Sequence, residues 1–313
     1  MSDIFNPNHY LDLNLLKKEG KDTFSLDLNN LYLLRKKQFP SFNFIIFSNE
    51  SILFSELNIN DNNLKIENSS IYVIREINKN SFLNIQLNGK SNIIIEDIAN
   101  KKNESNIHIN SQGQNNFYYF TNYSLEDLFY SNININIEGK LKSLIITKPQ
   151  IKKHKNNIQY FLSNKSEIEH NQFTENFYGQ LQDDSIEITH KEKSISKINY
   201  ISLNSGKIST QINSIIPFEA NNCETTQLIS HLVLEPNAVT KSKPNLVIKN
   251  KNVVASHGNN IGGFSQEDLF YLKQRGIKEE RAKKILAKSK YLSIIENDSL
   301  RISLLKYYED KNE

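Results

Sequence analysis

The sequence predicts a mainly β protein that ends in a small helical unit. Short segments with alternating apolar residues recur from about residue 41 to residue 255, which is typical of strands that bury one face. Closer to the C-terminus the alternation stops and helix-start and helix-stop signals replace it. We therefore divide the chain into a weakly helical N-terminal segment (residues 1–40), a β core (41–258) and a helical C-terminal domain (259–313).

The N-terminal segment shows only a weak helical pattern. Leu31, Leu33 and Leu34 could share one face of a helix, and Pro40 would end it.

Five segments of the core show the alternation most clearly. Their apolar positions are Leu64 and Ile66; Leu83, Ile85 and Leu87; Ile107 and Ile109; Ile133, Ile135 and Ile137; and Ile186 and Ile188. Clusters of Asn, Gly and Ser separate these segments and are typical of turns. Helical periodicity is almost absent between them, which excludes a βαβ fold.

Three architectures fit such strands: a sandwich, a barrel and a parallel β-helix. The periodicity contains no strict repeat and does not choose among them. Two-residue hairpin signals are missing except at Asn88-Gly89, which favours the β-helix somewhat. Asparagine also tolerates the left-handed backbone that solenoid corners require.

The C-terminal domain begins with a helix that local chemistry defines at both ends. Ser265 is an N-cap type and Asp268 follows three residues later as the acid of a capping box. Gly276 fits the position after the helix, and Ile277 fits the next position of a Schellman motif. The pattern predicts a helix from about Gln266 to Arg275.

Two further helices are expected after the first. One starts at Glu279 and Glu280, with Ala282, Ile285 and Leu286 as its inner face. Another is expected from Leu300 to Tyr308.

Composition excludes several classes of protein. The 313 residues include 38 basic and 35 acidic side chains, so a net charge of +3 gives no case for a nucleic-acid or membrane partner. The first ten residues contain no apolar stretch of a signal peptide, and no run of about 18 apolar residues occurs. We therefore expect a cytoplasmic protein. The bias toward Asn, Ile and Lys is typical of an AT-rich genome, such as that of an endosymbiont or a plastid-type organelle.

Few residues suggest chemistry. The single cysteine, Cys223, excludes an intramolecular disulfide and an all-cysteine metal site, and no basic neighbour would activate it. Asp183 and Asp184 are expected in a solvated turn; on a strand they would point to opposite faces. None of the histidines has the spacing of a zinc motif, and no phosphate-binding loop or nucleophile elbow occurs. His257 stands out because it ends an apolar run and precedes a glycine.

The stretch around His257 resembles the C-terminal signature of the SufB/SufD family of the SUF iron–sulfur cluster assembly system. The matching positions are Lys243, Pro244, Leu246, Ile248, Val253, Ser256, His257, Gly258, Gly262, Leu269 to Leu272 and Arg275 to Ile277. A weaker match precedes them at Thr225, Leu232, Leu234 and Ala238. The Ser-His-Gly triplet and the single cysteine resemble the SufD branch more than the SufB branch.

The resemblance implies a right-handed parallel β-helix with a C-terminal helical domain and a shortened N-terminal region. It implies a non-catalytic scaffold that pairs with a SufB-like subunit through the β-helix. A SufC-like ATPase would dock on the C-terminal helices, for which Phe270, Tyr271 and Arg275 are candidates. His257 would lie at the SufB interface as a candidate iron ligand for a transient cluster. No stably bound cofactor is expected.

One departure and two alternatives accompany this resemblance. Many SufD chains have cysteine two residues before the histidine, whereas this chain has Ala255. An exported β-helix polysaccharide lyase or hydrolase is the first alternative, although it would need clustered acids that the sequence does not show. A SufB-like homodimeric scaffold is the second, and the cysteine count disfavours it.

Overall fold

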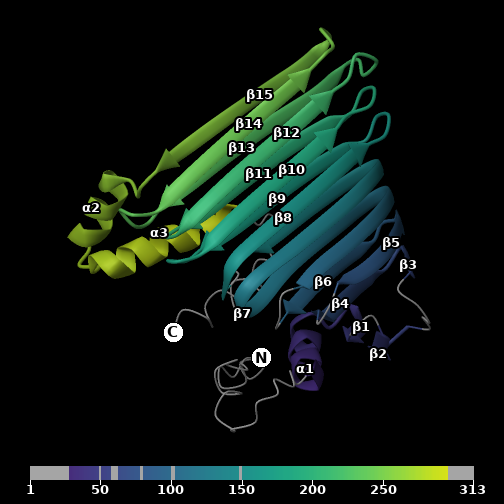
Figure 1. The fold of residues 1–313 in the computed structure, drawn as a ribbon, viewed down its shortest axis with the longest axis horizontal. Coiled ribbons are helices and arrows are strands. Elements are labelled where there is room, and N and C mark those ends of the chain that lie inside the picture. Colours follow the sequence, from purple (N-terminus) through teal and green to yellow (C-terminus); the bar gives the residue numbers. More distant parts are fainter. Residues whose placement is uncertain are drawn as a thin grey trace.

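The chain forms a parallel β-solenoid of about seven turns, with helices packed along one side (Figure 1). The computed structural model describes residues 28–48, 51–57, 63–77, 80–99, 103–147 and 150–294. The predicted β-helix with helices at its C-terminal end is thus confirmed. The helix expected from Leu300 to Tyr308 and most of the N-terminal segment lie outside the described residues.

Two parallel sheets face each other across the solenoid, and most turns contribute one strand to each. Sheet A contains β3 (Asn63–Glu67), β5 (Ser81–Gly89), parts of β7 (Asn103–Thr147), β8 (Gln150–Leu162), β10 (Leu181–Thr189), β12 (Lys207–Ile216) and β14 (Val239–Ile248). Sheet B contains β1 (Asn43–Ser48), β4 (Ser70–Ile77), β6 (Asn92–Ala99), other parts of β7, β9 (Glu167–Asn176), β11 (Ile195–Asn204), β13 (Cys223–Val233) and β15 (Val253–Gly262). The strand β2 (Ser51–Ser55) pairs antiparallel with β1 at the N-terminal edge.

Each turn of the solenoid begins a new pair of strands in register with the previous pair. The shortest offset between partners is 84 − 63 = 21 residues, from Asn63 to Asn84. The longest is 239 − 207 = 32 residues, from Lys207 to Val239. Because turn length varies this much, no repeat of fixed period is visible in the sequence.

A residue with positive φ occupies the corner from sheet A to sheet B in seven successive turns. These residues are Asn68, Gly89, Gly113, Gly139, Lys165, Lys193 and Asn222. Asparagine takes the suggested corner role at Asn68 and Asn222, whereas glycine or lysine stands at the other corners named. Asn88-Gly89 marks a corner and not a hairpin. The three glycines stack so closely that a Cβ on Gly113 would collide with the carbonyl oxygen of Gly89.

The hydrophobic core fills the space between the two sheets. All the alternating residues that predicted the five strands are buried there: Leu64, Ile66, Leu83, Ile85, Leu87, Ile107, Ile109, Ile133, Ile135, Ile137, Ile186 and Ile188. Stacking in register turns each inward position into a column along the solenoid, and neighbouring turns bury one another's apolar side chains.

Sheet B is also covered on its outer face, by two helices (Figure 1). Near the N-terminal edge α1 (Leu28–Gln38) packs against Phe44 and Tyr72, and Arg35 forms a buried ion pair with Glu96 at 2.8 Å. Near the other end α3 (Glu279–Ser293) packs Tyr291 against Phe173, with ring centroids 4.8 Å apart.

The inner face of α3 differs from the prediction at one position. Ala282 is buried as expected, but Ile285 is 39% exposed, and Ala287 and Tyr291 are buried instead. Ala287 and Tyr291 belong to the apolar cluster that packs on sheet B, and Ile285 lies outside it.

The short helix α2 (Gln266–Gln274) has the predicted ends. The hydroxyl of Ser265 accepts a hydrogen bond from the backbone N–H of Asp268 at 3.2 Å. After the helix, Gly276 has φ +80°, and Ile277 N–H donates to the carbonyl of Leu272 at 3.2 Å. This is the Schellman motif expected from the sequence.

No helix in the described ranges is long and apolar enough to cross a bilayer.

Candidate functional site at the open end of the solenoid

The solenoid ends at β14 and β15, which have no further turn stacked on them in the described part of the chain (Figure 1). Half-buried and exposed side chains alternate along most of β14, and β15 contains only half-buried and exposed residues, whereas β12 and β13 bury about every second residue. Val247, Val254 and Ile261 are 43%, 67% and 47% exposed. This open end, defined as strands β14 and β15, presents two free strand edges with apolar side chains beside them, which is the form of a pairing surface.

His257 lies in the middle of the open end. The β core was expected to end at residue 258, one residue after His257, whereas β15 continues through Gly262. The strand continues because β13 provides a backbone template for it, pairing Cys223 to Val253 and onward to Leu232 with Gly262. His257 is exposed, and its register partner is the fully buried Gln227.

Two hydrogen bonds tie the sheets together around His257. The side-chain amide of Gln227 donates to the backbone carbonyl of Asn245 in β14 at 3.1 Å. The hydroxyl of Ser242 in β14 donates to the side-chain oxygen of Asn259 in β15 at 3.0 Å. The β13–β15 ladder holds the backbone of His257, while its side chain is exposed.

The candidate docking residues lie on α2 and just after it. Phe270 and Tyr271 are 62% and 56% exposed, so they do not serve the core. The guanidinium of Arg275 lies over the Tyr271 ring at 5.2 Å from its centroid, a cation–π contact. Together they form a helix face separate from His257.

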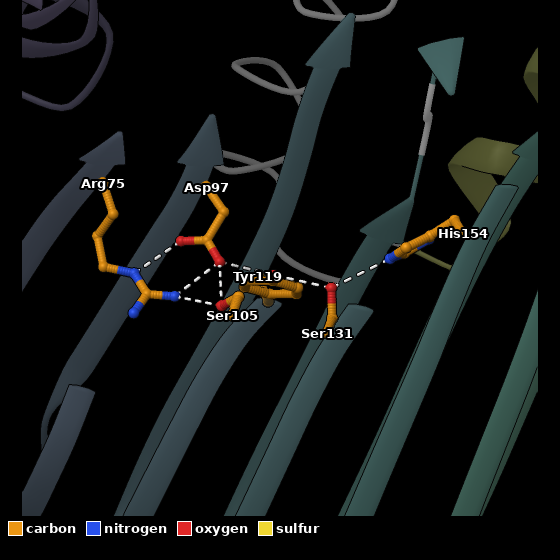
Figure 2. Close-up of polar contacts among 6 residues, drawn as sticks. All are labelled: Arg75, Asp97, Ser105, Tyr119, Ser131 and His154. Atoms are coloured by element: carbon orange, nitrogen blue, oxygen red, sulfur yellow. Dashed lines mark hydrogen bonds and ion pairs between the residues drawn. The ribbon is translucent and has the colours of Figure 1, made fainter. Parts of the chain in front are cut away.

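The interior holds a feature that the sequence analysis missed. A chain of buried polar side chains runs between the sheets, beginning at Arg75 and Asp97 (Figure 2). Arg75 donates twice to Asp97, at 2.7 Å each, and Tyr119 Oη lies 2.8 Å from the same carboxylate. Ser131 Oγ then lies 3.2 Å from Tyr119 Oη and 3.1 Å from His154 Nε2. We call this set, extended below to Asp184 and Tyr200, the interior polar chain.

The chain continues from His154 to Asp184. The Gln182 amide lies within 3.2 Å of His154 Nδ1 and donates to Asp184 Oδ1 at 2.7 Å. Tyr200 and Thr174 donate to the other carboxylate oxygen. The solvated turn expected for Asp184 is therefore wrong, although Asp183 does point to the opposite, outer face.

Burial shifts the titration of the interior groups. It raises the pKa of Asp184 to about 6, against hydrogen bonds from Tyr200, Gln182 and Thr174 that favour the carboxylate. It lowers the pKa of four histidines to about 4: His154, His170, His190 and His231. These histidines are thus neutral at physiological pH and act as hydrogen-bonding parts of the interior.

Cys223 is a structural residue. It is fully buried at the start of β13, and its thiol donates to the backbone carbonyl of Lys191 at 3.0 Å. Within the described ranges, no three His, Cys, Asp or Glu side chains are grouped to hold a metal ion. Among the described residues, His257 thus belongs to no such group of three.

Comparison with known proteins places the fold in context. The family model "SUF system FeS cluster assembly, SufBD core domain" matches residues 105–290. An iron–sulfur cluster assembly SufBD family protein of Mycobacterium leprae is 38% identical over 78 residues, 25% of this chain and 20% of that protein. The chloroplastic protein ABCI7 of Arabidopsis thaliana is 40% identical over 70 residues, 22% of this chain and 15% of that protein. The chain thus matches a fifth or less of the length of these relatives.

Proposed function

Because the chain belongs to the SufBD family of the SUF iron–sulfur cluster assembly system, we propose that it is a SufD-like scaffold subunit. It pairs with a SufB-like subunit and does not itself catalyse a reaction. The open end of the solenoid is the observation that carries this proposal, because two free strand edges and exposed apolar side chains surround His257 there. Pairing with a partner strand would cover the strand edges, the apolar side chains and His257 together.

We propose His257 as a ligand shared between two chains. A neutral imidazole nitrogen is a competent iron ligand, and the ring faces solvent on the surface that a partner would cover. The iron–sulfur cluster is the cargo of this site, so the partner must supply the sulfur and the remaining ligands. Ala255, which replaces the cysteine of many SufD chains, leaves the imidazole as the candidate ligand of β15.

The α2 face is the proposed contact for a SufC-like ATPase. Phe270 and Tyr271 are exposed aromatic residues and Arg275 stacks on one of them, a combination that is common in interface hot spots. ATP hydrolysis in that partner would then act on the scaffold through α2 and α3.

Co-purification tests the pairing. The chain is co-expressed with a SufB-like and a SufC-like subunit, and Val247→Glu and Val254→Glu place charges on the open end. We expect both variants to lose the SufB-like subunit. Phe82→Glu is the matched control, since Phe82 is 60% exposed on β5 of sheet A, far from the open end. Retention of the partner by the valine variants would contradict the proposed interface. Self-association of the purified chain would favour the homodimeric alternative.

Cluster reconstitution tests the ligand. The complex is loaded anaerobically with iron and a sulfur source, and cluster yield is read from visible absorbance. His257→Ala should reduce the yield while leaving the complex intact, whereas His108→Ala, on a half-buried residue of β7, should not. An unchanged yield with His257→Ala would end the ligand role. For the docking face, we expect Phe270→Ala/Tyr271→Ala to lose the ATPase. Tyr178→Ala should keep it, since Tyr178 is an 80% exposed tyrosine in the turn between β9 and β10 and not on α2.

A further inference from the structure

The side chain directly beneath His257 carries an unused acceptor. Gln227 is fully buried, yet its Oε1 has no hydrogen-bond partner among the described residues. Its orientation is fixed from the other side, because Nε2 donates to Ser214 Oγ at 2.8 Å and to the backbone carbonyl of Asn245 at 3.1 Å. An amide held by both donor contacts cannot turn to satisfy Oε1 elsewhere without breaking them.

The register brings this acceptor to His257. The two residues pair in the parallel β13–β15 ladder, so their side chains leave neighbouring strands on the same face. Alternate residues of β13 from Cys223 to His231 are buried, which places Gln227 on the inward face. His257 therefore also belongs to the inward series and is exposed only because no further described turn covers it.

The same pair occurs once already in this solenoid, with the hydrogen bond formed. Gln182 and His154 are register partners in β10 and β8. There the amide lies 3.1 to 3.2 Å from the imidazole Nδ1. A glutamine and a histidine in adjacent turns can therefore make this contact within unstrained ladder geometry.

We infer that Gln227 is a positioning residue for His257: its Oε1 accepts the Nδ1–H of the imidazole. This bond satisfies the buried acceptor, fixes the ring and selects the tautomer with a free lone pair on Nε2, which faces the partner. Metal-binding histidines in proteins commonly have such an acceptor behind them. The inference deepens the proposed function and rests on it for its biological meaning, but the hydrogen bond itself does not require a partner or iron.

The tautomer of His257 in the isolated full-length chain tests the inference. Nitrogen-15 labelling of histidine and long-range proton–nitrogen spectra at alkaline pH report which ring nitrogen carries the proton, and His257→Ala assigns the signals. We expect Nδ1–H to predominate at His257, although Nε2–H predominates in free histidine. A wild-type spectrum dominated by Nε2–H would overturn the inference without any variant.

Three variants separate positioning from general damage. Gln227→Met removes the acceptor and should shift His257 toward Nε2–H, while Gln227→Glu keeps an acceptor oxygen and should preserve Nδ1–H. Gln211→Met, on a half-buried residue of the neighbouring β12, should change nothing. Unchanged His154 and His170 signals would show that each variant is folded. A His257 spectrum unaffected by Gln227→Met would also overturn the inference.

Cluster yield in the complex distinguishes a failure of this inference from a failure of the proposed function. In the complex, Gln227→Met should lower cluster yield by about 10-fold, the usual scale for the acceptor behind a ligand histidine, and Gln227→Glu should restore it. If the tautomer responds to Gln227→Met but His257→Ala leaves cluster yield unchanged, the positioning stands and the ligand role fails. If the tautomer does not respond, the positioning fails whatever the yield.

Discussion

Tyr200 and Asp184 form a hydrogen bond across the interior of the solenoid, joining β11 of sheet B to β10 of sheet A. The phenol donates and the carboxylate accepts. No ion pair accompanies this carboxylate among the described contacts, unlike Asp97, which is paired with Arg75. Asp184 is thus held by neutral donors, and its burial outweighs them and raises its pKa.

Asp184→Asn should stabilise the protein increasingly as the pH rises. The pKa of Asp184 is about 6 in the folded state against 3.8 in the unfolded chain. A raised folded pKa means that stability is greatest below pH 4 and is lost as the pH rises to about 6, by on the order of 3 kcal/mol. Asparagine removes this loss, so its advantage in urea unfolding should grow from pH 4 to pH 7.

Asp183→Asn is the control for this experiment. Asp183 precedes Asp184 on the same strand but is exposed on the outer face. Its substitution exchanges a carboxylate for an amide on the same strand without touching the interior polar chain. An Asp184→Asn advantage that does not depend on pH would contradict the titration of Asp184.

The four buried histidines should make the protein sensitive to acid. Burial lowers the pKa of each to about 4, below the ordinary 6.5. Their contribution is therefore present above pH 6.5 and is lost as the pH falls toward 4, by on the order of 3 kcal/mol each. Four such groups outweigh the opposite effect of Asp184. The midpoint temperature of thermal unfolding should therefore fall as the pH is lowered from 6.5 to 4.

His154→Gln should lower the number of protons taken up on acid unfolding by about one. Glutamine can keep polar contacts with Ser131 and Gln182 but cannot titrate. The slope of unfolding free energy against pH, measured near pH 5, should therefore be shallower than in the wild type. His108→Gln, on a half-buried histidine of β7, is the matched substitution outside the interior polar chain. An unchanged slope in His154→Gln would mean that His154 titrates alike in both states.

Local chemistry predicted those parts of the fold that depend on neighbours in sequence. Ser265 and Gly276 define α2 because a cap needs only the residues of one turn, and alternation such as Ile133, Ile135 and Ile137 marks an inward face directly. The choice of a β-helix over a sandwich or barrel depended on the family resemblance, since turns of varying length leave no fixed period.

The interior polar chain could not be predicted in this way. In β10, Leu181 points outward and is 40% exposed, while Gln182 and Asp184 point inward. The polar residues there are satisfied mainly by side chains of other strands, such as His154 of β8 beside Gln182 and Tyr200 of β11 beside Asp184, and no local pattern in the sequence shows these pairings. The extent of β15 was missed for a related reason. The strand continues past His257 because it pairs with β13, and its own residues do not signal this.

Breaking the buried Arg75–Asp97 pair should destabilise the protein severely. The ion pair has side-chain exposures of 2% and 0% and is held by two 2.7 Å hydrogen bonds. Arg75→Met leaves an uncompensated carboxylate and should cost about 3–5 kcal/mol in denaturant unfolding. Arg75→Met/Asp97→Asn should cost less than the sum of the single changes, since no charge remains. Additive costs would show that the two side chains are not energetically coupled.

The corner glycines allow strain and collision to be measured separately. Gly113 and Gly179 have φ values of +101° and +80°, so alanine is strained at both, by about 1–2 kcal/mol. A Cβ on Gly179 meets no atom within 4 Å, whereas one on Gly113 collides with the backbone carbonyl of Gly89. Gly113→Ala should therefore lose clearly more unfolding free energy than Gly179→Ala. Equal losses would mean that the stacked corners can separate freely, and that close packing of the glycine column does not hold successive turns in register.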